Sequence, residues 1–100
     1  MATISKALAR GAAATSSTTL YTVPASTTTV VTNIVVTNTA GTSGTFSLLL
    51  DDVSIATTVT VGAYDSTIID MKQVLATTKT IKGFASAITI NFHISGVEIA

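Results

Sequence analysis

Residues 29 to 38 have the sequence Thr-Val-Val-Thr-Asn-Ile-Val-Val-Thr-Asn, and this stretch decides the fold. Eight of the ten residues are branched at Cβ. A branched Cβ already restricts χ1 as a strand does, so these residues lose little freedom on a pleated surface. The stretch therefore predicts a β-strand.

This predicted strand carries apolar side chains on both faces. Because side chains alternate along a strand, Val30, Ile34 and Val36 point one way while Val31 and Val35 point the other. The second face is either solvated, which β-propensity alone allows, or buried in a contact between subunits. Val31 and Val35 are therefore candidate assembly contacts.

The same composition continues outward from this stretch. Twenty-one of the 100 residues are threonine, interleaved with valine, isoleucine and leucine. Strands are predicted at about 18–23, 29–38, 44–51, 53–61, 66–70, 72–75, 79–85 and 88–99. About eight short strands at this spacing predict an all-β fold, an antiparallel β-sandwich with a jelly-roll or immunoglobulin-like strand order.

Turn residues separate the predicted strands. Pro24 ends the first strand because proline cannot donate to a ladder, and residues 38 to 44 form a loop rich in Gly and Asn. Asp51 and Asp52 form a candidate two-residue hairpin turn, with its type left open. Gly96 predicts a bulge in the last strand.

Alternation also predicts the core. One face of each of three strands is apolar. The residues on these faces are Phe46, Leu48, Leu50, Val53, Ile55, Val59, Val61, Ile88, Ile90, Phe92 and Ile94. His93 lies on the opposite face of the last strand and is a candidate surface or interface residue.

The first 17 residues differ from the rest, since they lack strand alternation and are rich in Ala and Ser. They predict an extended N-terminal arm, residues 1–17, ahead of a β-sandwich domain at residues 18–100. An arm ordered only on binding makes attachment multivalent. Its candidate assembly contacts are Ile4, Lys6, Leu8 and Arg10.

Charge and length exclude several classes of partner. Charged residues make up 10% of the chain, the formal net charge is zero, and the basic residues are scattered. Nucleic-acid binding is not expected, because it needs clustered Lys and Arg. No apolar run approaches a membrane span, and no signal peptide is indicated. So little charge leaves the surface prone to association with other protein.

Catalytic chemistry is also sparse. The chain has no Cys and one His, and its aspartates lack calcium-loop spacing. His93 alone makes neither a zinc site nor a catalytic pair. We expect no enzymatic activity, no cofactor and no metal.

Two segments resemble a known family. Leu20-Tyr21-Thr22-Val23-Pro24-Ala25, followed by the strand ending Ile34-Val35-Val36-Thr37-Asn38, resembles the opening of small structural proteins of tailed bacteriophages and prophages. The start at residues 1–6 and the end at residues 90–99, Ile-Asn-Phe-His-Ile-Ser-Gly-Val-Glu-Ile, resemble the same family.

The resemblance implies a virion structural protein, assembled in the host cytoplasm. The expected role is capsid decoration or cement, through binding to the major capsid protein or other virion proteins, with a homotrimer at local threefold positions. The alternative is a neck, tail or fibre component that contributes to assembly or to binding of the host surface.

Overall fold

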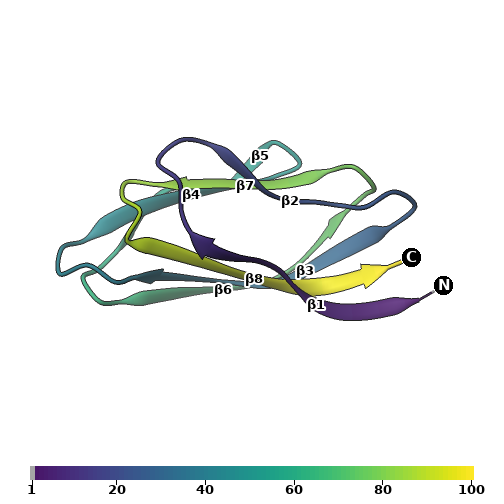
Figure 1. Cartoon of the computed structure of the whole chain (residues 1–100), viewed down its shortest axis with the longest axis horizontal. Coiled ribbons are helices and arrows are strands. Elements are labelled where there is room, and N and C mark those ends of the chain that lie inside the picture. The colour runs from purple at the N-terminus through teal and green to yellow at the C-terminus, as the bar shows by residue number, and fades with distance from the viewer. Residues whose placement is uncertain (1) are drawn as a thin grey trace.

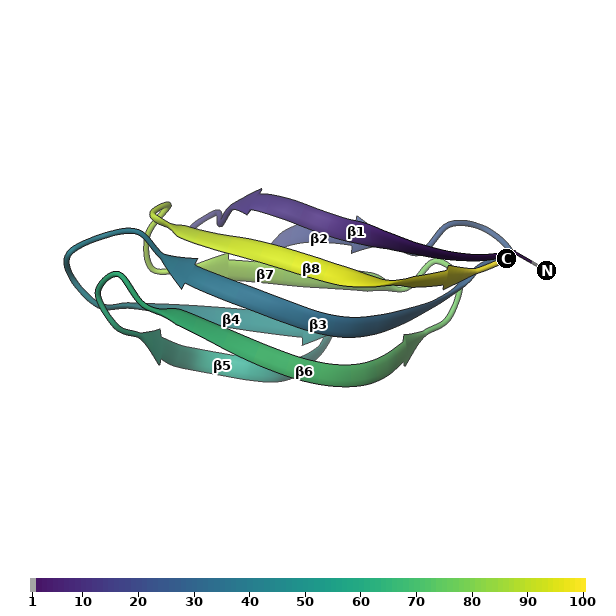
Figure 2. The same cartoon turned by 90° about the horizontal axis from the view of Figure 1, so that it is seen from below.

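Eight strands form two four-stranded sheets in the computed structural model, which describes residues 2–100 and contains no helix in that range. The strands are β1 (Thr3–Ala12), β2 (Thr18–Thr22), β3 (Thr28–Asn38), β4 (Gly44–Leu50), β5 (Val53–Val61), β6 (Ser66–Leu75), β7 (Thr80–Ala85) and β8 (Ile90–Ile99). The two sheets pack face to face as a sandwich, as Figures 1 and 2 show. This confirms the predicted all-β sandwich.

The strand order is that of a jelly roll. Sheet A has the order β1-β8-β3-β6 and sheet B the order β2-β7-β4-β5, with every neighbouring pair antiparallel. Every connection crosses from one sheet to the other except the β4–β5 hairpin. Of the two predicted strand orders, the immunoglobulin-like one does not fit.

The N-terminal segment is part of sheet A. Residues 3–12 form β1, which pairs with β8 along its length, so the prediction of an arm without strand structure is wrong for these residues. A β-ladder is made by backbone groups, and an edge strand whose side chains mostly face solvent needs no apolar alternation. The segments predicted at 66–70 and 72–75 are likewise one strand, β6.

The hairpin turn between β4 and β5 is confirmed. Asp51 and Asp52 are its two central residues, and both have positive φ, 54° and 60°. Positive φ at both positions defines a type I′ turn, whose twist matches that of the flanking strands. Their carboxylates meet Lys79 at 3.5 Å and Lys82 at 2.7 Å, respectively.

Most of the predicted core is confirmed. The inner faces of β4 and β8 bury Phe46, Leu48, Leu50, Ile90, Phe92 and Ile94. The rings of Phe46 and Phe92 meet edge to face across the two sheets, with centroids 6.2 Å apart and an angle of 75°. Ile88 differs, because it lies in the loop before β8 and is exposed.

The predicted core face of β5 is only partly correct. Val61 is buried and Val59 packs against the core, but Val53 and Ile55 are exposed. The register of β5 against β4 shifts twice, so its side chains do not alternate strictly. At one shift Thr58 takes a φ of 49° and its N–H donates to Ser47 Oγ at 3.0 Å. Two bulges therefore break the period on which the prediction depended.

The bulge predicted at Gly96 lies in the neighbouring strands instead. β8 keeps its alternation, while β3 has an extra residue at Thr32, opposite Gly96 and Ser95, and β1 has an extra residue at Leu8, opposite Ser95 and Ile94. A Cβ at position 96 would lie 2.5 Å from the Val30 carbonyl oxygen and 2.8 Å from Leu8 Cδ1. Glycine is needed there for close packing.

Candidate assembly surface

The outer face of sheet A is built from rows of side chains that cross all four strands. Directly paired residues of antiparallel strands project to the same side, so the register assigns each residue to a face. The central outward residues, called here the outer face of sheet A, are Ser5, Ala7, Arg10, Val30, Asn33, Val35, Ile68, Asp70, Lys72, Val74, His93, Ser95 and Val97, where Lys72 lies between Asp70 and Val74 at the shift in register of β6 against β3.

The row nearest the chain termini is apolar. It crosses Ser5, Val97, Val30 and Val74, in the order β1, β8, β3 and β6. Val74 is 67% exposed, and Val30 and Val97 are half-buried. Three adjacent valines therefore form a continuous strip on this side of the sandwich.

A second partly apolar row lies toward the other end. It crosses Arg10, His93, Val35 and Ile68. Ile68 is 66% exposed, while Arg10 and His93 are exposed beside the half-buried Val35. The structure thus brings together three residues that the sequence marked as candidate contacts from separate segments: Arg10, Val35 and His93.

A polar row separates the two. It crosses Ala7, Ser95, Asn33 and Asp70. The Asp70 carboxylate lies on β6 at one edge of this face, and the Arg10 guanidinium lies on β1 at the opposite edge, one row away. The face therefore has two rows rich in apolar side chains with a polar row between them, Arg10 at its β1 side, and Asp70 and Lys72 at its β6 side.

Val31 is not part of this surface. The extra residue at Thr32 shifts the alternation of β3, so Val31 joins Ile34 and Val36 on the inner face and is fully buried. The prediction that Val31 and Val35 share an outer face is wrong. Val30 takes the outward position instead, directly opposite Val97.

The other candidates from the N-terminal segment do not lie on the outer face either. Leu8 is buried against Gly96 and belongs to the core. Ile4 and Lys6 pair with Glu98 and Gly96 on the inner side of sheet A, near the end of the sandwich where the chain termini meet. Ile4 is 53% exposed there.

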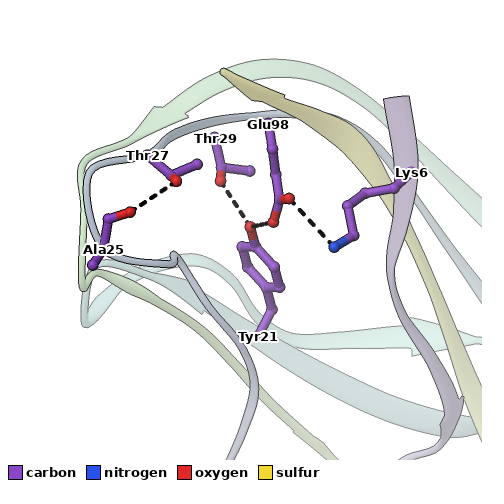
Figure 3. A network of polar contacts seen from close by, with 6 residues as sticks. All are labelled: Lys6, Tyr21, Ala25, Thr27, Thr29 and Glu98. Atoms are coloured by element: carbon purple, nitrogen blue, oxygen red, sulfur yellow. Dashed lines mark hydrogen bonds and ion pairs between the residues drawn. The ribbon is translucent and has the colours of Figure 1, made fainter. Parts of the chain in front are cut away.

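Lys6 belongs to a polar network that ties the two sheets together (Figure 3). Its Nζ lies 3.3 Å from Glu98 Oε1, and the Tyr21 hydroxyl donates to the other oxygen of the same carboxylate. Because that hydroxyl has one proton, the Thr29 hydroxyl donates to Tyr21 Oη, at 2.8 Å. The network joins β1, β8 and β3 of sheet A to β2 of sheet B.

The network shifts the pKa values of two of its members. Burial, reinforced by the hydrogen bond to Glu98, raises the pKa of Tyr21 to about 12. The hydrogen bond from Tyr21, followed by that from Lys6, lowers the pKa of the Glu98 carboxyl below its ordinary value. Both pKa shifts widen the pH range over which Tyr21 is neutral and Glu98 is ionised, which is the pair of protonation states that this hydrogen bond needs.

The outer face of sheet B has a different character. Its outward positions carry mostly hydroxyls and one lysine, with Leu49 and Phe84 half-buried among them. A half-open hollow of about 190 Å³ lies at one end of this face, and hydroxyl side chains make up most of its lining: Thr15, Thr45, Ser47, Thr58 and Ser86. The exposed apolar side chains of sheet B, Val53 and Ile55, lie on its edge strand β5, whereas those of sheet A continue across neighbouring strands.

Sequence reasoning missed four apolar members of this surface: Val30, Val97, Ile68 and Val74. The sequence placed Val30 on the same face as Ile34 and Val36, because the bulge at Thr32 has no local signature. The alternation of the last strand did contain a signal for Val97, because Val97 and His93 are separated by an even number of positions and therefore point to the same side of the strand. The positions on β6 could not be aligned with β3 without the register.

Within residues 2–100 no three potential metal-ligating side chains come together. No helix in that range could span a membrane. The chain matches no protein-family model, and no curated protein matches it closely enough to count as a relative.

Proposed function

We propose that the protein is a non-enzymatic structural protein of a bacteriophage virion that decorates or cements the capsid. The observation that carries this proposal is the apolar outer face of sheet A, which no other segment among residues 2–100 covers. In the assembled particle this face is covered by protein. The contacts are with the major capsid protein, other virion proteins or further copies of the chain.

The exposed apolar side chains of sheet A lie close together. This grouping favours an interface, because valines that only stabilise a solvated strand would be scattered singly over the surface. Val74, Val30 and Val97 lie side by side, and Ile68 lies beside Val35 on the other side of the polar row. Contiguous apolar patches on small domains mark interaction sites. The near absence of charge at the centre of the patch matches the composition of interface cores.

The edge strands of both sheets are poorly suited to pairing with a strand of another chain. Contact with a partner through a sheet face is therefore favoured. β5 carries two bulges, β2 has five residues, and β1 and β6 both carry irregularities near the middle. Bulged and short edge strands resist pairing with another chain. A partner that binds this sandwich therefore packs on its outer surface.

The strand order and the sequence resemblance support the same role. Jelly-roll sandwiches occur in viral capsid and lectin domains, and fold alone leaves the choice between such functions open. The resemblance of residues 20–25 and 90–99 to small structural proteins of tailed phages favours the virion. A binding module of this kind needs no catalytic group.

Reconstitution tests the proposal. Particles of the encoding phage that lack this protein are mixed with purified wild-type chain or with the Val35→Lys/Ile68→Lys variant, and the bound protein is measured by co-sedimentation. The wild type should bind in many copies per particle. The variant should fail to bind, because burying unpaired ammonium groups in an apolar contact costs several kcal/mol.

A matched control separates a surface effect from unfolding. The Leu49→Lys/Thr60→Lys variant places two lysines on the outer face of sheet B and should bind as the wild type does. Equal binding by all three proteins would show that the outer face of sheet A is an ordinary solvated surface. No binding by the wild type would contradict a decoration role.

The second candidate is a neck, tail or fibre component that binds the host surface. One end of the sandwich favours it, since the loops at residues 39–43, 62–65 and 86–89 meet there through backbone hydrogen bonds. This end presents Tyr64, 77% exposed, and Ile88, 70% exposed. If this role is correct, Tyr64→Ala/Ile88→Ser should reduce phage adsorption to host cells and leave the amount of protein in the particle unchanged.

A further inference from the structure

We infer that the outer face of sheet A binds the same face of a second copy of the chain, in a dimer whose twofold axis runs parallel to the strands between β8 and β3. This inference gives the proposed assembly surface a specific occupant. It concerns the purified protein and can be tested without any particle.

The apolar rows are self-complementary under this symmetry. The rotation exchanges the positions of β8 and β3 and those of β1 and β6, and it leaves each row at the same height. Val30 of one copy then faces Val97 of the other, and Val97 faces Val30. In the polar row, Ser95 faces Asn33, which gives a hydroxyl opposite an amide.

The same rotation brings one pair of opposite charges close together. Arg10 lies on β1, and in the dimer β1 faces the partner copy's β6, which carries Asp70 and, two residues farther from Arg10, Lys72. The two residues belong to adjacent rows, which are two residues apart along a strand, or about 7 Å. Asp70 itself faces Ala7, a small residue that leaves room for the guanidinium to reach the carboxylate. Symmetry makes two such pairs, one at each side of the interface.

The position of Arg10 distinguishes this orientation from the other face-to-face arrangement. A twofold axis perpendicular to the strands would place β1 over β1 and β6 over β6. Residues 3–12 contain no acidic side chain, so each Arg10 would then face no carboxylate on that strand. Asp70 and Lys72 would face only the same two residues of the second copy, and Arg10 would contribute no ion pair.

Charge reversal tests the inference. The wild type, Arg10→Asp, Asp70→Arg and the double variant Arg10→Asp/Asp70→Arg are compared by sedimentation equilibrium over a range of concentrations, after thermal melts have shown that each is folded. We expect the wild type to dimerise and each single variant to dimerise about tenfold or more weakly, because like charges face each other at two places. The double variant should regain most of the lost affinity, since both pairs are restored in reverse.

Lys82→Asp is the matched control, because Lys82 is a cation on the outer face of sheet B. It should leave dimerisation unchanged. A variant outside the charge pair, Val97→Lys, should abolish the dimer.

Each remaining outcome overturns the inference. A wild type that stays monomeric at millimolar concentration shows that the face does not bind itself. A trimer excludes the twofold arrangement. If neither single charge reversal changes the affinity of the dimer, Arg10 and Asp70 do not meet. The same conclusion follows if the double reversal does not restore the affinity that a single reversal has lost. None of these results bears on whether the protein attaches to a capsid.

Discussion

Single residues decide which side chains this sandwich offers to a partner. The extra residue at Thr32 turns Val31 inward and Val30 outward, so one bulge determines the composition of the outer face. The Thr32 hydroxyl donates to the Ser95 carbonyl oxygen at 3.1 Å, which fixes the bulge against β8. No local sequence pattern announces such a bulge, because it depends on the pairing of distant strands.

Phe92 and His93 should differ sharply in their effect on stability, although they are neighbours. Phe92 is buried against Phe46, whereas His93 is exposed on the outer face. Phe92→Ala should lower the free energy of unfolding by about 3–5 kcal/mol. His93→Ala should change it by less than about 0.5 kcal/mol, as expected for an exposed position. Denaturant melts check both, and equal losses would contradict the register of β8.

The Tyr21–Glu98 hydrogen bond should make stability depend on pH at both extremes. The pKa of Glu98 is lower in the folded than in the unfolded chain, so its contribution is present above the unfolded pKa and is lost as pH falls through the folded one. The pKa of Tyr21 is raised from 10.0 to about 12, so its contribution is complete below pH 10 and is lost between pH 10 and about 12.

Thermal melts from pH 3 to pH 12 check this prediction. Tyr21→Phe should remove much of the loss at high pH, and Glu98→Gln should reduce the loss at low pH. Tyr64→Phe is the control, because that side chain is largely exposed. Parallel pH profiles for the wild type and Tyr21→Phe would show that the network does not contribute.

Gly96→Ala should be strongly destabilising. The added Cβ would meet the Val30 carbonyl oxygen at 2.5 Å, and this atom belongs to the backbone of a paired strand and cannot rotate away. Forcing atoms into such a site costs about 1–3 kcal/mol or more. Gly62→Ala is the control, since the nearest atoms there lie at 3.7 Å. Urea melts should separate the two variants, and equal stability would mean that β3 and β8 lie farther apart at this point.

At the scale of elements, the strands that alternate strictly were predictable and the others were not. β4 and β8 bury one apolar face each, as their sequences indicated. β5 was assigned to the right place, but its bulges move Val53 and Ile55 to the surface. β1 could not be recognised, because it is held by its backbone and by the single buried side chain of Leu8.

Removal of residues 2–12 should therefore lower stability. It would expose the edge of β8, remove Leu8 from above Gly96 and separate Glu98 from Lys6. Each kcal/mol lost lowers the thermal midpoint of a domain of this size by about 4–8 °C. We expect a clear drop in scanning calorimetry. An unchanged midpoint would show that the N-terminal segment is an arm after all, docked on β8 without contributing to the fold.

At the scale of the whole molecule, the two outer surfaces of the sandwich differ in chemistry. The molecule measures 45 × 21 × 18 Å, with the chain termini together at one end of its long axis. The sequence pointed to a two-faced valine strand and to His93, and the structure places Val35, His93 and Arg10 in one row. It could not show which distant residues complete the surface, because Ile68 and Val74 reach it only through the pairing of β6 with β3.

The proposed virion role is tested most directly by a cryo-electron microscopy map of a phage particle produced from a genome that carries this coding sequence. The account predicts jelly-roll density of this size in many copies over the capsid lattice, with the outer face of sheet A covered by protein. Density confined to the neck or tail would contradict capsid decoration and favour the alternative role. Absence of the protein from the particle would contradict the virion role altogether.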